Sequence, residues 1–270
     1  MSKRFGQNFL VNPNAREKII KLLSPAPAET VWEIGPGFGA MTHMIAGKTE
    51  GLTVFEIDHG FCSFLNEKFQ DVEHFRLVEG DFLKTWRREL EERGQPDCII
   101  GNLPYNVGSI IIGDLIKSSK IRSRMVFTLQ KEVVKRMAAR PGSADYSGFS
   151  LICQFTCRVE NHGDVSGGSF YPKPRVVSSI VRLTPHNEHP DVNRELFISL
   201  VNDMFAARRK TLRNNLIKGA TAARWGREPV LEGLESMNLP EGIRGEKMNM
   251  DEVIALSNAI EKIMIKDEKI

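Results

Sequence analysis

The sequence predicts an α/β protein in which a Rossmann-like, mainly parallel sheet is followed by a small all-helical C-terminal domain. Short apolar or β-branched runs alternate with helix-like stretches over the first half of the chain, as in βαβ units. After the proline-bounded segment 185–190, strand-like runs stop and helical periodicity continues to the C-terminus. We therefore expect one domain over residues 1–186 and a second over residues 187–270.

The expected strands and helices follow from the length and period of the apolar runs. Parallel strands are expected at 30–34, 52–57, 75–78, 98–101 and 125–129. Helices are expected at 41–46, 61–69, 83–92, 109–118 and 131–139. Two later runs should complete the sheet as strands, 151–159 and, as an antiparallel partner, 178–183. In the C-terminal domain, helices are expected at 196–205, 211–218, 229–237 and 251–265.

Composition and charge narrow the class of protein. The 270 residues, 41% hydrophobic and 26% charged, can bury one large core and a smaller second one. Residues 1–7 lack the apolar core of a signal peptide, and no apolar run approaches the roughly 20 residues of a membrane span. We expect a cytoplasmic protein that contacts no membrane.

Cationic residues are concentrated in one block, although the net charge is only +3. Between residues 206 and 227 there is no acidic residue, and the cations are Arg208, Arg209, Lys210, Arg213, Lys218, Arg224 and Arg227. Such a block is typical of surfaces that bind polyanions, and a solvated helix face is the alternative interpretation.

Cysteines and histidines predict neither disulfides nor a metal site. The four cysteines are too scattered for a disulfide framework, and three residues rather than two separate Cys153 from Cys157. At this spacing the two thiols would share one face of the expected strand 151–159, as buried core residues. The six histidines form no pair with the spacing of metal ligands, so no metal cofactor is expected.

A glycine-rich turn predicts a ligand site at the carboxyl edge of the sheet. The expected strand 30–34 runs into Gly35-Pro36-Gly37-Phe38-Gly39, where glycines let a ligand approach the backbone closely. The third glycine comes one residue too early for the dinucleotide pattern, and a bare turn is the alternative interpretation.

The next two strand ends carry carboxylates. Glu56 is placed to accept hydrogen bonds from both hydroxyls of a ribose, although a solvated strand end would look similar. Asp81 suits an adenine amino group, with Phe82 beside the ring. Glycine, glutamate and aspartate at successive strand ends describe a nucleoside pocket without a pyrophosphate site. This pattern favours S-adenosylmethionine over a nicotinamide cofactor.

The fourth strand ends in Asn102-Leu103-Pro104-Tyr105, which predicts the reaction. The 6-amino nitrogen of adenine is a poor nucleophile because its lone pair is delocalised into the ring. The Asn102 side-chain oxygen and the Leu103 carbonyl could each accept one amino hydrogen and so aim the lone pair at a methyl donor. Pro104 would hold that carbonyl, and Tyr105 would stack on the base. A proline turn with a packed tyrosine is the structural alternative.

A target base inside RNA structure must be unpaired or extruded, and a second stacking surface would help to retain it. Phe170 is the candidate, in the proline-stiffened stretch Phe170-Tyr171-Pro172-Lys173-Pro174. Prolines at the entry to an edge strand would give the same pattern.

Together these residues resemble the ribosomal RNA adenine dimethyltransferase family, and specifically its small-subunit branch, the kasugamycin-resistance type. The matching motifs lie at 3–10, 33–39, 56–58, 102–106, 129–133 and 170–178. The resemblance implies a class I methyltransferase domain followed by a helical domain that contacts rRNA. It also implies transfer of four methyl groups from S-adenosylmethionine, two to each of two adjacent adenosines near the 3' end of small-subunit (16S) rRNA. The partner would be the immature small ribosomal subunit, and we expect a monomer.

The resemblance implies residue roles as well. Asn8 and Leu10 would close over the methionine end of the cofactor. The rest of the cofactor site would be formed by Gly35, Gly37, Glu56, Ile57, Asp81, Phe82 and Asn102. The stretch 205–216 looks like the C-terminal signature of this branch. The resemblance therefore implies that Arg208, Arg209, Lys210 and Arg213 contact RNA.

Two departures from the family pattern occur. Val177 stands where the family usually has an acidic residue, and Val107-Gly108-Ser109 replaces the more usual Ile-Ser-Thr. Neither removes an expected ligand, and we expect an effect on loop packing or on substrate preference.

Two other functions remain open from the sequence. A large-subunit rRNA adenine methyltransferase of the antibiotic-resistance type would share the domain and the chemistry, but the C-terminal signature argues against it. A noncatalytic RNA-binding assembly or transcription factor could use the same fold, but the intact Glu56, Asp81 and Asn102 argue for activity.

Overall fold

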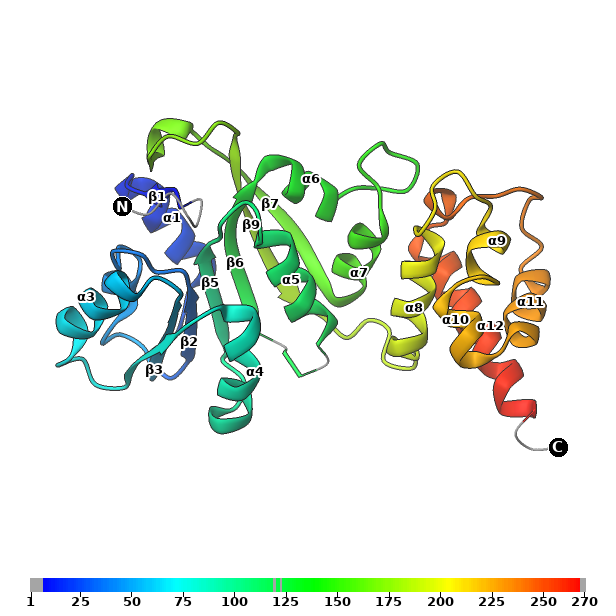
Figure 1. Ribbon diagram of the computed structural model, residues 1–270, viewed down its shortest axis with the longest axis horizontal. Helices are drawn as coiled ribbons and strands as arrows, with labels where there is room; N and C mark the ends of the chain where they lie inside the picture. The colour runs from blue at the N-terminus through cyan, green and yellow to red at the C-terminus, as the bar shows by residue number, and fades with distance from the viewer. Residues whose placement is uncertain (1–6, 119, 122, 268–270) are drawn as a thin grey trace. The chain divides into compact units, whose positions relative to one another are not determined.

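The computed structural model describes residues 7–118, 120, 121 and 123–267. Its main feature is a seven-stranded mixed sheet in the order β4-β3-β2-β5-β6-β9-β7 (Figure 1). The strands are β2 (Thr30–Ile34), β3 (Gly51–Glu56), β4 (Phe75–Glu79), β5 (Cys98–Asn102), β6 (Arg124–Gln130), β7 (Cys157–Val165) and β9 (Ser178–Pro185). The first five are parallel, and β9 runs antiparallel between β6 and β7. The five predicted parallel strands are confirmed to within one residue at each end. The predicted antiparallel strand 178–183 is also confirmed, although β9 continues two residues further, to Pro185.

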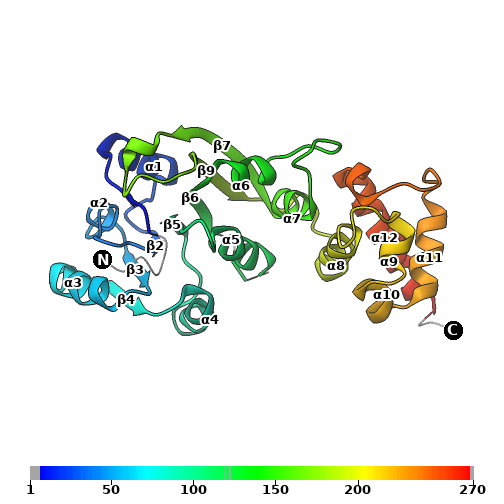
Figure 2. The ribbon, with the colours of Figure 1, turned by 45° about the horizontal axis from the view of Figure 1, so that its top comes forward.

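Helices cover both faces of the sheet. Figure 2 shows α1, α2 and α3 on one face and α4 and α5 on the other. Their bounds, with those of the next helix, are α1 (Pro13–Leu23), α2 (Thr42–Ile45), α3 (His59–Phe69), α4 (Phe82–Arg93), α5 (Gly108–Lys117) and α6 (Lys131–Met137). All except α1 were predicted. The start of α1 follows standard capping chemistry, since the Asn12 side chain accepts from the backbone N–H groups of Asn14 and Ala15.

The predicted strand 151–159 is wrong over most of its length. Residues Gly148–Thr156 form helix α7, and β7 begins only at Cys157. A short continuous apolar run fits a buried helix as well as a buried strand, and tertiary packing chooses between them. Here Phe155 stacks on Phe197 of α8 (Arg194–Met204), with the ring centroids 3.9 Å apart. Cys153 and Cys157 therefore do not share a strand face, although both are buried.

Backbone contacts divide the chain into two compact units. The N-terminal unit holds residues 1–135 and 157–186, and the C-terminal unit holds 136–156 and 187–270. The second unit differs from the predicted domain 187–270 by gaining the segment 136–156, because α7 packs on α8. Its other helices are α9 (Leu212–Leu216), α10 (Ala220–Trp225), α11 (Arg227–Ser236), η3 (Gly245–Lys247) and α12 (Met250–Asp267). Of these, α10 and the short helix η3 were not predicted. None of the helices in the described ranges is long and apolar enough to cross a membrane.

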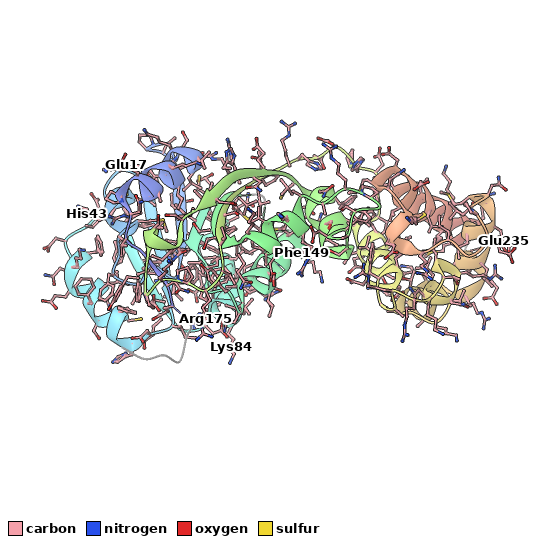
Figure 3. All side chains as sticks on the ribbon, turned by 90° about the horizontal axis from the view of Figure 1, so that it is seen from above. Glu17, His43, Lys84, Phe149, Arg175 and Glu235 are labelled. Atoms are coloured by element: carbon pink, nitrogen blue, oxygen red, sulfur yellow. The ribbon has the colours of Figure 1, made fainter. Side chains whose placement is uncertain are left out.

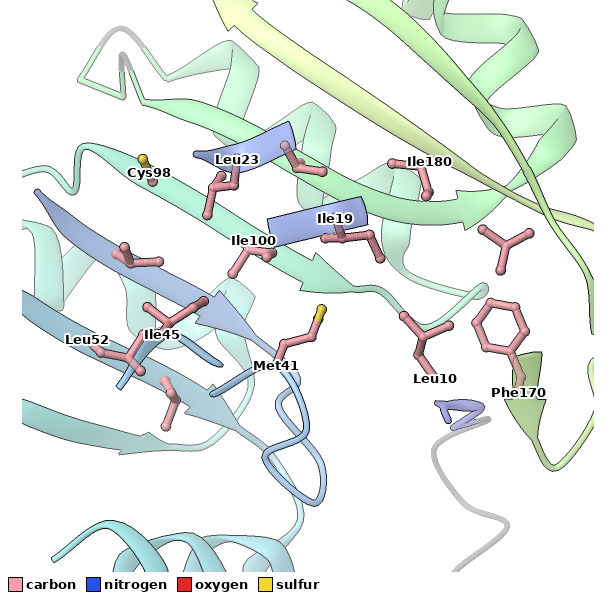
Figure 4. Close-up of a cluster of buried hydrophobic side chains, with 14 residues drawn as sticks. Leu10, Ile19, Leu23, Met41, Ile45, Leu52, Cys98, Ile100, Phe170 and Ile180 are labelled. Atoms are coloured by element: carbon pink, nitrogen blue, oxygen red, sulfur yellow. The ribbon is translucent and has the colours of Figure 1, made fainter. Parts of the chain in front are cut away.

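A two-stranded ribbon ties the N-terminal segment to the sheet. Strand β1 (Phe9–Leu10) pairs antiparallel with β8 (Phe170–Tyr171), which follows the short helix η2 (Gly167–Ser169). Leu10 and Phe170 lie opposite each other in this register and are both buried in the main apolar cluster, beside each other in Figure 4. Burial of these two side chains anchors the ribbon.

Gly101, in the middle of the sheet, lies where no side chain fits. A Cβ there would be 2.8 Å from the Ile34 carbonyl oxygen and 2.9 Å from Leu103 Cδ2. We expect Gly101→Ala to lower the free energy of unfolding by about 1–3 kcal/mol, because the clash involves backbone of the adjacent strand. Gly168→Ala is the control, since its Cβ would meet no atom within 4 Å. Urea denaturation measures both, and equal stability of the two variants would contradict this account.

Candidate active site

A cavity of about 190 Å³ opens where the parallel strands end. The structure brings eleven of the predicted site residues to its walls. They are Asn8, Gly35, Gly37, Glu56, Ile57, Asp81, Phe82, Asn102, Leu103, Pro104 and Tyr105. Carboxyl ends of parallel strands share one edge of a sheet, so residues far apart in the chain meet there. All of these residues belong to the N-terminal unit.

The glycine-rich turn is shaped by left-handed backbone and a close neighbour. Gly35, Gly37 and Gly39 have φ of 67°, 56° and 71°, which other residues rarely adopt. A Cβ at Gly37 would also lie 2.9 Å from the ring of Phe9. The turn therefore needs glycine for its conformation and for the approach of the N-terminal segment.

Glu56 is held by the backbone around it. Its Oε1 accepts from the N–H groups of Ile57 and Asp58 at 2.8 and 2.9 Å, and Oε2 accepts from Gly37 N at 3.1 Å. Burial raises the pKa of this carboxyl, although the backbone donors oppose the shift. A carboxylate has about four acceptor positions, so three backbone bonds leave about one for a ligand. For Glu56 to accept from both ribose hydroxyls, as predicted, one of its three hydrogen bonds from backbone N–H groups would have to be replaced by a bond from the ribose.

Asp81 and Phe82 lie at the next strand end. Asp81 is the N-cap of α4 and accepts from Leu83 N through Oδ1 at 3.0 Å, so Oδ2 remains available to accept from a ligand. Phe82 is buried and packs edge-on against Phe55, with centroids 4.9 Å apart. Helix capping thus orients the carboxylate, and the aromatic pair forms an apolar wall.

Asn102 is oriented by a segment remote in sequence. Its Nδ2 donates to the backbone carbonyl of Asn8 at 2.6 Å. Because the amide nitrogen is used this way, the amide oxygen is the atom left for a substrate, and no described residue donates to it. The backbone N–H of Leu103 donates to Thr128 O at 3.2 Å, which holds the following peptide in place.

Tyr105 is fixed from its hydroxyl end. The hydroxyl lies 2.5 Å from Ser178 Oγ at the start of β9, and Ser178 is fully buried. Burial raises the pKa of the phenol, so Tyr105 stays neutral at ordinary pH. The hydrogen bond holds the hydroxyl end of this cavity-lining side chain.

Leu10 and Phe170 are not brought to the cavity. Leu10 is 6% exposed and Phe170 is 4% exposed, and both pack in the apolar cluster instead (Figure 4). The structure therefore presents neither side chain to a ligand. Conversely, the cavity is lined by residues that the sequence analysis did not single out, among them Gln7, Phe9, Phe55 and Ile111. The position of Gln7 and Phe9 inside the motif 3–10 was the available signal for two of them, although residues 3–6 of that motif lie outside the described ranges.

Glu33, beside the glycine turn, is an ionisable group in the core. It is fully buried and accepts from Thr42 Oγ1 of α2 at 2.6 Å. Burial raises the pKa of this carboxyl to about 7. The bond to Thr42 joins the end of β2 to the helix that follows the turn.

The residues predicted to contact RNA lie on the C-terminal unit. Arg208, Arg209 and Lys210 are exposed in the loop between α8 and α9, so the alternative of a solvated helix face does not apply to them. Buried Asn215 holds this loop by donating to the carbonyls of Met204 and Ala207.

Folding also brings acidic side chains to the basic block. Arg208 pairs with Glu246 and Arg213 with Glu235, each at 3.5 Å, and Figure 3 shows Glu235 at the surface. Exposed ion pairs contribute about 0–1 kcal/mol, so a phosphate can compete for these arginines.

Gly108, one of the residues that depart from the family pattern, is explained by packing. A Cβ at this position, the first residue of α5, would lie 2.6 Å from Leu129 Cδ2. Glycine thus lets α5 start close against β6. Nothing in the structure explains Val177 in terms of packing, since its side chain is 48% exposed.

The fold and the cavity together define a class of enzyme. A class I methyltransferase has a parallel sheet with one antiparallel strand, which here is β9 beside β6. It also has a glycine turn, a glutamate and an aspartate at successive strand ends, as this cavity does. No group of three or more His, Cys, Asp or Glu within the described part of the chain could hold a metal ion.

Comparisons with known proteins agree. A family model described as ribosomal RNA adenine dimethylase matches residues 1–228. The chain is 40% identical over 266 residues to ribosomal RNA small subunit methyltransferase A of Treponema pallidum (strain Nichols), covering 98% of the chain and 92% of the relative. It is 39% identical over 259 residues to the protein of that name from Borreliella afzelii (strain PKo), covering 96% of the chain and 88% of the relative. The chain belongs to the ribosomal RNA adenine dimethylase family, which depends on S-adenosylmethionine, and the resemblance predicted from its motifs is confirmed.

Solved structures show the same fold. A dimethyladenosine transferase from Plasmodium falciparum superposes with a TM-score of 0.80 at 24% identity, covering 94% of this chain and 98% of the other. The 23S rRNA methyltransferase ErmE superposes with a TM-score of 0.66 at 22% identity, covering 94% and 100%.

Buried Glu33 predicts an unusual dependence of stability on pH. Between pH 4.5 and about 7 the unfolded chain loses the Glu33 proton while the folded protein keeps it, so this group makes the protein less stable as pH rises. Above about pH 7 the penalty is constant, on the order of 3 kcal/mol. Glu33→Gln cannot ionise, so its stability relative to the wild type should increase from pH 4.5 to 7.5 in urea denaturation. A constant difference across this range would contradict the assignment.

Proposed function

We propose that this protein transfers methyl groups from S-adenosylmethionine to the 6-amino nitrogens of two adjacent adenosines near the 3' end of small-subunit (16S) rRNA, acting as a monomer on the immature small subunit. The observation that carries the proposal is the geometry at Asn102, whose amide nitrogen is bound by Asn8 and whose oxygen is left to accept. The curated relatives, named small subunit methyltransferases, support the choice of rRNA.

The residues of the cavity fit S-adenosylmethionine. Glu56 retains about one acceptor position for a ribose hydroxyl, and Asp81 Oδ2 can accept from the adenine amino group. Phe82 offers an apolar wall beside the ring, and the positive φ of the glycine turn lets the methionine end approach the backbone. When bound, this cofactor supplies an activated methyl group on a sulfonium.

Catalysis by the chain's own residues is positioning. Asn102 Oδ1 and the Leu103 carbonyl each accept one hydrogen of the adenine amino group, so the nitrogen lone pair points away from the base plane. Tyr105 stacks on the base and stays in place because Ser178 holds its hydroxyl. With S-adenosylmethionine bound, this arrangement would direct the lone pair at the methyl group that the cofactor supplies, and the proton released from the methylated amino group would pass to water. A fixed arrangement of dipoles of this kind needs no ionised general base.

Asn102 variants test the catalytic assignment. We expect Asn102→Ala to abolish methyl transfer while RNA affinity stays within about twofold, because it removes the acceptor at the reacting nitrogen together with the hydrogen bond to the Asn8 carbonyl. Asn102→Asp keeps the acceptor but cannot donate to the Asn8 carbonyl, so we expect it to lose at least about tenfold in kcat. Single-turnover methylation and cofactor titration measure both. Full activity of Asn102→Ala would refute the role of this side chain.

Arg209 and Arg213 test the RNA surface of the C-terminal unit. We expect Arg209→Ala and Arg213→Ala each to weaken RNA binding and to reduce the slope of log K against log[salt] by about 1, because each phosphate contact releases counterions. Lys262→Ala on α12 is the control for loss of one exposed cation. A salt slope unchanged in the arginine variants would place those residues outside the interface.

The substrate is tested by mapping. The protein is incubated with labelled S-adenosylmethionine and with immature small or large subunits, and modified adenosines are located by primer extension. We expect two adjacent dimethylated adenosines in the small-subunit rRNA. Label in the large subunit would identify the rival methyltransferase, and no label in either would favour a noncatalytic assembly role.

A further inference from the structure

The β1–β8 ribbon places Tyr171 at the edge of the active-site cavity. Residues directly opposite each other in an antiparallel pair share one face, with Cβ atoms about 4.5–5.5 Å apart. Leu10 and Phe170 form the inward-facing pair. The other pair, Phe9 and Tyr171, therefore faces away from the core, and Phe9 lines the cavity. Tyr171 is thus a neighbour of a cavity residue although it does not itself line the cavity.

The ring of Tyr171 is presented to solvent. Its side chain is 63% exposed, and it makes no ring contact with any described residue. A tyrosine exposed to this degree next to a nucleoside cavity is a surface on which a base can stack.

The segment that carries this tyrosine is fixed to the catalytic motif. We call residues 171–177 the rim loop. At its start, Phe170 is buried, and at its end the Val177 carbonyl accepts from Lys131 N at 2.9 Å. The next residue, Ser178, holds the hydroxyl of Tyr105. A base stacked on Tyr171 would therefore have a defined position relative to a base stacked on Tyr105.

The rim loop has the chemistry of a single-stranded nucleic-acid surface. Lys173 and Arg175 are exposed, the latter labelled in Figure 3, and the loop contains no acidic residue. Val176 and Val177 are also exposed, at 43% and 48%. Cations next to an aromatic ring and apolar side chains suit a phosphate backbone with unpaired bases.

We propose that the rim loop is a subsite for the unpaired nucleotide adjacent to the target adenosine. The ring of Tyr171 stacks on the neighbouring base while Lys173 and Arg175 contact the flanking phosphates. This inference rests on the proposed RNA substrate. It explains how one adenosine of an adjacent pair is retained while the other is held at Asn102 and Tyr105.

A fluorescent base tests the stacking. The probe is an RNA hairpin from the 3' end of small-subunit rRNA with 2-aminopurine, whose fluorescence falls on stacking, in place of the adenosine next to the target. We expect the wild type and Tyr171→Phe to quench the probe. Tyr171→Ala should lose most of the quenching and bind the hairpin about tenfold more weakly, with unchanged affinity for S-adenosylmethionine. Phe64→Ala, which removes another exposed ring outside the cavity wall, should behave as the wild type.

The outcomes separate the subsite from the proposed function. Quenching and affinity of Tyr171→Ala within twofold of the wild type would overturn the subsite and leave the methyltransferase proposal intact. A second probe carries 2-aminopurine in place of the target adenosine itself. If Tyr171→Ala lost quenching only with this second probe, Tyr171 would stack on the target base, and the subsite would also be overturned. Failure of the wild type to bind both the hairpin and immature small subunits would refute the RNA substrate and the subsite together.

The cations are tested separately. Lys173→Ala and Arg175→Ala should each reduce the salt slope for the hairpin by about 1, whereas Lys262→Ala should not. With immature small subunits, Tyr171→Ala should raise KM more than it lowers kcat, since the subsite binds RNA rather than the reacting nitrogen. An unchanged KM would count against the subsite.

Discussion

The geometry of the active site depends on the hydrogen bond from the Asn102 side chain to the backbone carbonyl of Asn8, at 2.6 Å. An amide has its donors on one atom and its acceptor on the other, so this bond determines which atom is offered to a substrate. It also joins two parts of the chain 94 residues apart. Because Asn8 lines the same cavity, the proposed cofactor site and the proposed base site share one contact, and loss of the N-terminal segment would disorient the catalytic side chain.

Several further contacts keep the catalytic motif rigid. Gly108 N donates to the Pro104 carbonyl at 2.9 Å, and the hydroxyl of Tyr105 is held by Ser178. Close packing of Gly108 against Leu129 sets the start of α5. A reaction that relies on orientation rather than on a general base needs this kind of preorganisation, since small displacements of the acceptors would misdirect the nitrogen lone pair.

The C-terminal unit shows how folding modifies a charge pattern. In the sequence the basic block contains no acidic residue, yet in the structure Glu195, Glu235 and Glu246 lie beside three of its arginines. Arg209 and Lys210 have no ion partner among the described residues, and they occupy a loop that Asn215 holds in place. The net field of this surface is therefore weaker than its sequence indicates, while the exposed cations are held on a defined backbone.

The sequence by itself determined the parallel strands, the glycine turn and the order of Glu56, Asp81 and Asn102 along the sheet edge. Continuous apolar runs identify buried parallel strands, and strand ends of one sheet necessarily meet. Tertiary structure decided what depends on packing partners: α7 is a helix because Phe155 stacks on Phe197, and Phe170 turns inward because its register partner is Leu10. It likewise decided that three backbone donors occupy Glu56. Such outcomes arise from contacts between segments far apart in the chain, which local periodicity does not encode.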